Sequence, residues 1–130
     1  MNGAKKNTRA VGSLKETEAC TYLENKGYEI LERNFQTKAA EIDIVAKTKD
    51  LAGTSILVFV EVKYRGNMAK GSALEAVDAR KQRQICKVAD YYRYLHKMGE
   101  NTMVRYDVLA IQGENIQWIR NAFPHIYTRG

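Results

Sequence analysis

The sequence predicts an α/β fold in a single domain: a mixed sheet of about five strands flanked by helices. Three observations predict it. The chain has 130 residues, which fits one domain. Its content of 45% hydrophobic and 28% charged residues is that of a globular protein. Helical and strand patterns follow in the order helix, three strands, helix, two strands. We expect the domain to span residues 1–130, with flexible ends at about 1–11 and 125–130.

The elements are expected in the following order. A helix over Ser13 to Lys26 ends at Gly27, a typical C-terminal cap. A strand over Glu41 to Lys47 alternates, with Ile42 and Ile44 on one face and Glu41 and Asp43 on the other. The remaining strands are predicted at Tyr28 to Phe35, Ile56 to Tyr64, Met103 to Ile111 and Asn115 to Arg120, and the second helix runs from Ser72 or Asp78 to Lys97.

Several classes of protein are disfavoured. No apolar run reaches the ~18 residues of a membrane helix, and no apolar segment follows the basic N-terminus as it would in a signal peptide. The expected location is therefore the cytoplasm, with no membrane partner. Cys20, Cys86, His96 and His125 lack the spacing of a zinc site, and two cysteines do not make a disulfide scaffold.

The charge is distributed unevenly along the chain. The net charge is +6, and residues 79–130 contribute nine Lys or Arg against four Asp or Glu, a net of +5. Residues 41–78 carry five basic and six acidic residues, a net of −1. A strongly basic last third favours an anionic partner such as nucleic acid.

Charged residues interrupt the most apolar predicted strand. Glu61 and Lys63 are two positions apart, so their side chains lie on the same face. Burying such groups is costly unless they are paired or bound to a metal. A cross-strand salt bridge would satisfy this pair, and the strand alone does not decide between the two arrangements.

The preceding strand adds two more acids. If it forms a hairpin with the apolar strand, Glu41, Asp43, Glu61 and Lys63 can converge on one sheet face. Three carboxylates so close repel one another unless a divalent cation lies among them, and carboxylates suit Mg²⁺ or Mn²⁺. Such an ion can activate water for attack on a phosphodiester, and a neighbouring lysine can orient that water and offset developing charge.

Asp43, followed by Glu61-Val62-Lys63, resembles the PD-(D/E)xK nuclease motif. Further segments resemble the YraN-like family of small bacterial proteins, predicted endonucleases of the restriction-endonuclease-like superfamily, over about residues 12–123. These segments are Gly12-Ser-Leu-Lys-Glu16-Thr-Glu-Ala19, Tyr22-Leu23, Gly27-Tyr28, Arg33-Asn34, Glu41-Ile-Asp43-Ile-Val-Ala46, Val60-Glu61-Val62-Lys63-x-Arg65, Lys81-Gln82, Arg105-Tyr-Asp107-Val and Asn121-Ala-Phe123. Lys15 and Ala40 stand where the family usually has glycine, which puts bulk near the expected site.

The resemblance implies a restriction-endonuclease-like core with one metal site. Asp43, Glu61 and the backbone carbonyl of Val62 would bind Mg²⁺ or Mn²⁺, and Lys63 would position the attacking water. Glu16 matches a helix glutamate of similar archaeal Holliday-junction resolvases. The stripe Gly12, Glu16, Ala19 and Leu23 also turns Glu16 toward the sheet, whereas Ser13-x-x-Glu16 fits a capping box with no role in a site. Glu41 is expected to orient Lys63 or to join the metal shell.

The second helix offers nucleic-acid contacts. Its expected buried face comprises Ile85, Val88, Ala89, Tyr92 and Leu95, and the opposite face carries Arg80, Arg83 and Lys87. Lys81 falls on the buried side with Gln82 at its edge, so Lys81 either reaches the acids or a phosphate, or extends past the core to solvent. Arg65 is a candidate phosphate ligand. The tyrosines Tyr91, Tyr92, Tyr94, Tyr106 and Tyr127 are expected to belong mostly to the core or an interface.

The leading interpretation is a Mg²⁺-dependent endonuclease acting on DNA, with a place in repair or recombination. Symmetric cutting of two strands would favour a homodimer. The main alternative is a non-catalytic nucleic-acid-binding module on the same fold. A third interpretation is a structural or partner-binding domain whose acids form salt bridges and bind no metal.

Overall fold

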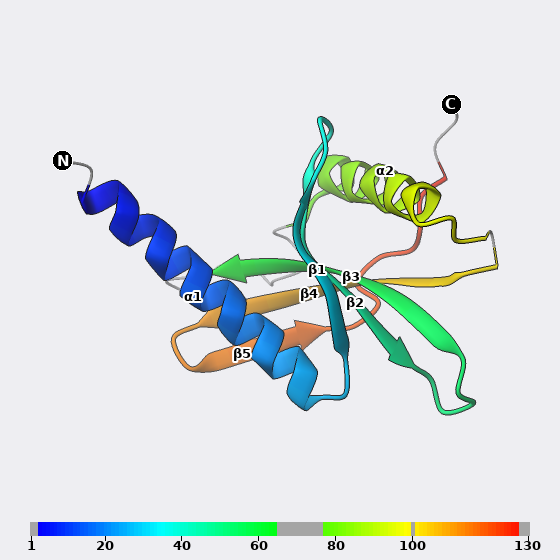
Figure 1. Cartoon of the computed structure of the whole chain (residues 1–130), viewed down its shortest axis with the longest axis horizontal. Coiled ribbons are helices and arrows are strands. Elements are labelled where there is room, and N and C mark those ends of the chain that lie inside the picture. The colour runs from blue at the N-terminus through cyan, green and yellow to red at the C-terminus, as the bar shows by residue number, and fades with distance from the viewer. Residues whose placement is uncertain (1–2, 65–76, 100, 128–130) are drawn as a thin grey trace.

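A mixed five-stranded sheet carries one helix on each face in the computed structural model, which describes residues 3–64, 77–99 and 101–127 (Figure 1). The predicted α/β class and order of elements are confirmed. The elements are α1 (Gly3–Asn25), β1 (Glu29–Gln36), β2 (Glu41–Lys49), β3 (Ser55–Tyr64), α2 (Ala79–Leu95), β4 (Met103–Gln112) and β5 (Asn115–Ile119). The architecture is compatible with a restriction-endonuclease-like core.

The strands lie in their sequence order, β1-β2-β3-β4-β5. Neighbouring strands are antiparallel except β3 and β4, which run parallel with Glu61 opposite Val108. A parallel pair needs a crossover connection, and that connection carries α2. The apolar run of β3 lies at the centre of the sheet, as the sequence predicts.

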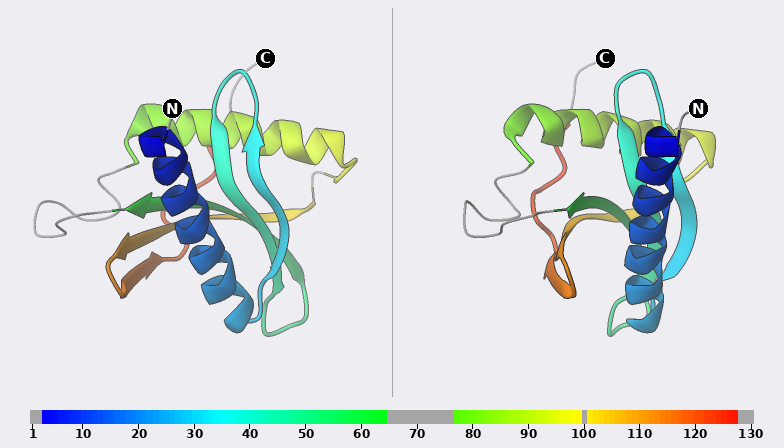
Figure 2. Two further views of the ribbon diagram at one scale, coloured as in Figure 1. Left: turned by 60° about the vertical axis from the view of Figure 1, so that its left-hand side comes forward. Right: turned by 90° about the vertical axis from the view of Figure 1, so that its left-hand side faces the viewer.

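Each face of the sheet has its own core. On the α2 face, Ile85, Val88 and Tyr92 pack with residues such as Phe59 and Tyr106. On the α1 face the core is formed by Ala19, Cys20, Leu23, Tyr28, Ile44, Ala46, Val58, Val60, Val62, Leu109 and Ile111. Figure 2 shows α1 and α2 on either side of the sheet, with the tip of the β1–β2 hairpin rising beside α2.

The helix ends follow local rules, with two corrections. Gly27 (φ +91°) ends α1, and the Tyr28 amide donates to the Leu23 carbonyl at 3.1 Å, which confirms the predicted cap. Asp78 caps α2 through a 2.8 Å bond from the Lys81 amide. The predicted start of the first helix at Ser13 is wrong, because α1 begins at Gly3. No helix in the described ranges is long and apolar enough to cross a membrane.

The other correction concerns the buried face of α2. The sequence predicts Leu95 in the core, but Leu95 is 46% exposed. It is the last residue of α2 and lies beyond the turn in which Tyr92 faces the sheet. Of the tyrosines, Tyr92 and Tyr106 are buried as predicted, whereas Tyr91, Tyr94 and Tyr127 are exposed. Cys20 and Cys86 are both buried free thiols.

A buried aspartate ties β4 to β5 on the α1 face. Asp107 is 1% exposed and accepts from the Arg105 guanidinium at 2.8 and 2.9 Å. The Trp118 indole donates to it at 3.0 Å and the Asn121 amide at 2.9 Å. Arg105 also donates to the Tyr28 hydroxyl. The charge of Asp107 is thus compensated by an ion pair and four hydrogen bonds, a structural arrangement.

Candidate active site

The candidate site lies where β2 and β3 part. Their backbone pairing proceeds along both strands as far as Ile44 and Val60. One residue beyond, the Asp43 side chain takes over, and its Oδ2 accepts from the Val62 amide at 2.8 Å. Asp43 is therefore held against β3 beside Glu61, so the predicted hairpin brings these two acids together.

The strand does not alternate through this region as predicted. Ile42 packs in the core on the α2 face, whereas Ile44 packs in the core on the α1 face. The expectation that both lie on one face is wrong. Ile42 stays paired with Phe35 of β1 while β2 leaves β3, and this local change of direction accompanies the insertion of Asp43 toward β3.

Glu61 is the buried centre of the site. It is 8% exposed, and Lys63 Nζ lies 3.9 Å from its Oε1. Lys81 Nζ, from the first turn of α2, lies 4.0 Å from Oε2. This Oε2 atom is buried and makes no hydrogen bond within the described part of the chain. The prediction that Glu61 and Lys63 share a face is confirmed, and of the two alternatives for Lys81 the structure shows contact with the acids.

Asp43 is held in surroundings that disfavour its charged form. Burial raises the pKa of Asp43 to about 8, and the adjacent Glu61 carboxyl adds to the rise, although the Val62 amide opposes it. The pKa of Glu41 is also raised, first by its own burial and then by Asp43. A cation bound between the acids would favour their ionised forms.

Glu16 approaches the acids from α1. Its Oε2 accepts from Asn34 Nδ2 at 2.8 Å and pairs with Arg33 Nη2 at 3.5 Å. The charge of Glu16 adds to the rise in the pKa of both Asp43 and Glu41. A capping box is excluded because Ser13 lies inside α1, ten residues after its start.

The contact of Glu16 with Asn34 was not predicted. Asn34 occupies the left-handed region at φ +53°, which asparagine tolerates better than most residues. The pair Arg33-Asn34 is a segment of the family resemblance, and that was the available signal. Its partner could not be named, because the contact depends on how α1 packs against β1.

The donor set fits a divalent cation in part. Asp43 and Glu61 supply two adjacent carboxylates, and one Glu61 oxygen is buried with no hydrogen bond to any residue that the structure describes. Such hard oxygen donors suit Mg²⁺ or Mn²⁺. In the described ranges, no three Asp, Glu, His or Cys side chains are grouped to hold a metal. A third ligand would have to be backbone or water, as expected for the Val62 carbonyl.

The basic residues of α2 differ in their surroundings. Arg80, Arg83 and Lys87 are exposed, as predicted. Gln82 instead donates from Nε2 to the Val77 carbonyl at 2.9 Å, just before the helix. Arg65 lies outside the described residues. The exposed cations of α2 are thus free to face a polyanion, whereas Gln82 secures the entry to the helix.

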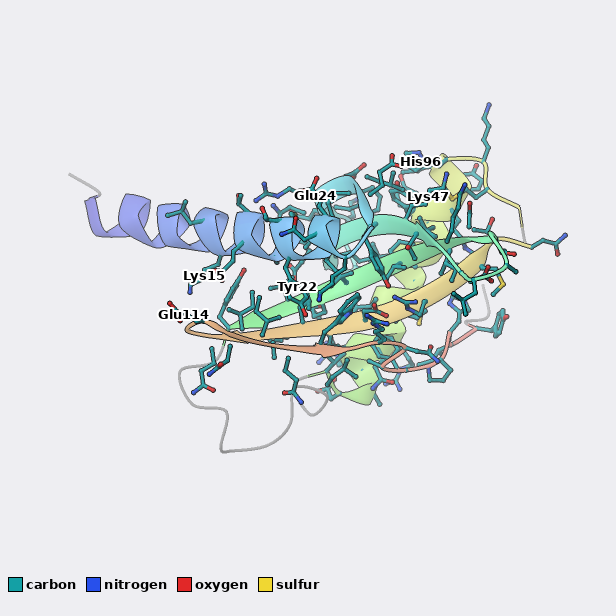
Figure 3. All side chains as sticks on the ribbon, turned by 90° about the horizontal axis from the view of Figure 1, so that it is seen from below. Lys15, Tyr22, Glu24, Lys47, His96 and Glu114 are labelled. Atoms are coloured by element: carbon teal, nitrogen blue, oxygen red, sulfur yellow. The ribbon has the colours of Figure 1, made fainter. Side chains whose placement is uncertain are left out.

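The two departures from the family pattern are accommodated. Lys15 extends from α1 on the side of the β4–β5 turn, where Glu114 lies (Figure 3). Ala40 is half-buried against the core on the α2 face, and its carbonyl accepts from the Thr37 amide at 2.9 Å. Ala40 therefore closes the β1–β2 turn next to Glu41.

Known protein sequences match this chain over most of its length. The sequence model of the uncharacterised protein family UPF0102 matches residues 15–111. A UPF0102 protein of Lachnoclostridium phytofermentans is 45% identical over 117 residues, which cover 90% of this chain and 95% of the relative. A UPF0102 protein of Desulforapulum autotrophicum is 44% identical over 87% of this chain and 92% of the relative. A UPF0102 protein of Pseudomonas putida is 37% identical over 95% of this chain and 98% of the relative. The chain therefore belongs to the UPF0102 family, the YraN-like family that its sequence motifs resemble.

Proposed function

We propose that this protein is a metal-dependent endonuclease that hydrolyses DNA phosphodiester bonds on a PD-(D/E)xK core, in repair or recombination. The observation that carries the proposal is the buried Glu61 carboxylate. Within the described residues one of its oxygens has no hydrogen bond, two lysines lie at 3.9 and 4.0 Å, and Asp43 lies beside it. A salt bridge alone would explain one lysine and one acid, but it does not explain a second buried acid at the same point.

Asp43 and Glu61 are the residues that would hold Mg²⁺ or Mn²⁺, with the Val62 carbonyl as a further ligand. A divalent cation bound there supplies a water of lowered pKa and polarises a phosphate oxygen. Asp43 is held for this task by the Val62 amide, and Glu61 by the rigid centre of the sheet.

The two lysines are placed to act on the phosphate and the attacking water. Their side chains are 30% and 33% exposed, so each reaches from the buried acid to solvent. Lys63 would orient the water and donate to a non-bridging oxygen, where negative charge grows in the transition state. Lys81 would offset the same charge from α2, while Glu41 orients Lys63 and Glu16 adds to the acidic edge.

The DNA backbone is expected to lie along α2. Arg80, Arg83 and Lys87 are exposed on this helix, and residues 79–130 carry a net charge of +5. Phosphate neutralisation by such cations gives binding that weakens as salt is added. Arg65, next in sequence to the candidate strand, would add a phosphate contact.

The test is cleavage of supercoiled plasmid, single-stranded DNA and a four-way junction with Mg²⁺ or Mn²⁺. Glu61→Gln and Lys63→Ala should each lower the cleavage rate by about 100-fold or more. Glu114→Gln, at the exposed β4–β5 turn, is the matched control for the acid. Lys47→Ala is the control for the lysine, since Lys47 pairs with Leu57 far from Asp43 and lines the same pocket as His96 (Figure 3). Cleavage that survives Glu61→Gln contradicts the proposal.

A second candidate is a DNA-binding module without catalysis. It is favoured by the presence of only a two-carboxylate donor set in the described chain, where no larger group is arranged for metal. It predicts salt-dependent DNA binding by a wild type that cleaves none of the substrates, with affinity unchanged by Asp43→Asn. A structural domain whose acids only form salt bridges would bind neither DNA nor Mn²⁺.

A further inference from the structure

A groove lies between the tip of the β1–β2 hairpin and the middle of α2. Gln36, Thr37, Lys38 and Ala39 line it from the hairpin, and Lys87 and Tyr91 line it from the helix. Figures 1 and 2 show the hairpin tip standing beside α2. No part of the nuclease mechanism above uses this groove, apart from the contact expected for Lys87.

The two elements that line the groove also carry residues of the candidate site. On the hairpin side, Gln36 pairs with Glu41 across the turn. On the helix side, Lys87 follows Lys81 by six positions, which is about 9 Å along the axis at 1.5 Å per residue. A strand whose phosphate lies at Lys81 would therefore reach the groove within a short length of chain.

The charge of the groove selects a polyanion. Among the residues that the structure describes, its lining contains Lys38 and Lys87 and no carboxylate. Arg80, Lys81, Arg83 and Lys87 all lie between Ala79 and Ala89, a stretch of α2 without an acidic residue. The partial positive charge at the start of the helix adds to this field. Asp90, the next acid, is engaged by Arg93 at 2.8 Å and does not neutralise the row.

An aromatic ring stands in the same groove. Tyr91 is 48% exposed, and its ring lies 6.4 Å from that of Phe35 on β1. Phe35 is in turn fixed edge-on against the buried Tyr92. Tyr91 is thus supported on one side and open on the other. An open ring beside cations is the combination by which proteins stack unpaired bases while holding the backbone.

We infer that this groove binds an unpaired nucleic-acid strand next to the scissile phosphate, with Tyr91 stacking on a base and Lys38 and Lys87 contacting phosphates. A base inside a duplex has no free face for Tyr91, so the preferred ligand is a single strand, a flap or an unpaired arm. This inference rests on the proposed function only for its link to cleavage. The binding itself is independent of Asp43 and Glu61.

The test is equilibrium binding of labelled 12-nucleotide oligo-dT and oligo-rU, and of a 12-base-pair duplex, to the full chain in EDTA. Tyr91→Ala should weaken oligonucleotide binding about fivefold or more, from the loss of one stacked base, and leave duplex binding within twofold. Tyr91→Phe should restore it. Tyr94→Ala is the matched control, because Tyr94 is 78% exposed on the same helix and is not part of the groove lining. The dT and rU probes separate DNA from RNA as the source of the strand.

Salt titration tests the phosphate contacts. Lys87→Ala should reduce the slope of log K against log salt by about 0.7, the value for one single-strand phosphate contact. Three results would overturn the inference. The first is that wild type binds no oligonucleotide, and the second is that Tyr91→Ala loses as much affinity for the duplex as for the oligonucleotide. The third is that poly-glutamate displaces the oligonucleotide equally well from wild type and from Tyr91→Ala. Glu61→Gln should bind the oligonucleotides like wild type. If it does and wild type cleaves nothing, the nuclease proposal fails while the groove stands.

Discussion

Asp43 of β2 accepts a hydrogen bond from the Val62 amide of β3, 2.8 Å away, beyond the last backbone pair of the two strands. The Asp43 side chain thus replaces a backbone hydrogen bond between β2 and β3 at the point where the two strands separate. The carboxyl that results is buried and next to Glu61, and burial raises its pKa to about 8.

Asp43 should make the metal-free protein less stable as the pH rises. Its pKa is 3.8 when exposed and about 8 in the fold, so the neutral carboxyl contributes stability fully present below pH 4. That contribution is lost as the pH rises through 8. The free energy of unfolding should fall by on the order of 6 kcal/mol across this window. Urea denaturation in EDTA at pH 5 to 9 measures it, and Asp43→Asn should flatten the slope. An equal slope in the variant would assign the effect to another group.

Mn²⁺ should stabilise the protein through the same carboxyls. At a concentration 100 times its dissociation constant, a ligand that binds only the folded state adds about 2.7 kcal/mol. Thermal denaturation with and without Mn²⁺ should therefore show a rise in Tm for wild type and none for Asp43→Asn or Glu61→Gln. Glu114→Gln should keep the wild-type rise. A rise retained by both site variants would place the bound ion elsewhere.

Asn34 should affect activity more than stability. Asn34→Gly keeps the left-handed backbone at φ +53° and removes the 2.8 Å bond to Glu16. We expect cleavage to fall about tenfold, one charge-assisted hydrogen bond being worth about 1.5–3 kcal/mol, with a small change in Tm. Asn121→Gly is the matched control, since Asn121 has the same φ and donates to Asp107 from its backbone amide, which glycine retains. Equal losses of cleavage in both glycine variants would argue against a role for the Glu16 contact.

Asp107 should affect stability and leave the chemistry alone. Its side chain is fully buried, so Asp107→Ala leaves Arg105 without its carboxylate partner and the Trp118 indole without its acceptor. The expected cost is about 3–5 kcal/mol, read as a lower midpoint in urea. Asp90→Ala, at a carboxyl that is 37% exposed, should cost about 1 kcal/mol or less. If the Asp107 variant were as stable as wild type, the network would not be structural.

Local patterns predicted most of the fold. Alternation and turn residues located all five strands, and the spacing of Glu61 and Lys63 within β3 predicted that they lie on one face. Helical periodicity also placed Lys81 on the inner side of α2, where it meets Glu61. These inferences succeeded because each depends on residues close together in sequence.

The predictions were wrong where the structure does not follow from a local sequence pattern. Ser13 resembles a helix N-terminus, yet α1 continues back to Gly3, a stretch with no apolar stripe to indicate it. Ile42 and Ile44 obey strict alternation only in a regular strand, and β2 parts from β3 at that point. The contact of Asn34 with Glu16 depends on the packing of α1 across β1. None of these follows from a local pattern.

The parallel pairing of β3 with β4 has a consequence for the newborn chain. Asp43, Glu61 and Lys63 belong to a hairpin that can form as soon as β3 has left the ribosome. Lys81 lies on α2, within the connection from β3 to Met103–Gln112, the parallel strand that pairs with β3. Non-local closure of this kind is slow compared with hairpin formation. During synthesis the acids therefore assemble before their second lysine arrives, and the cluster is complete only once nearly the whole polypeptide has been made.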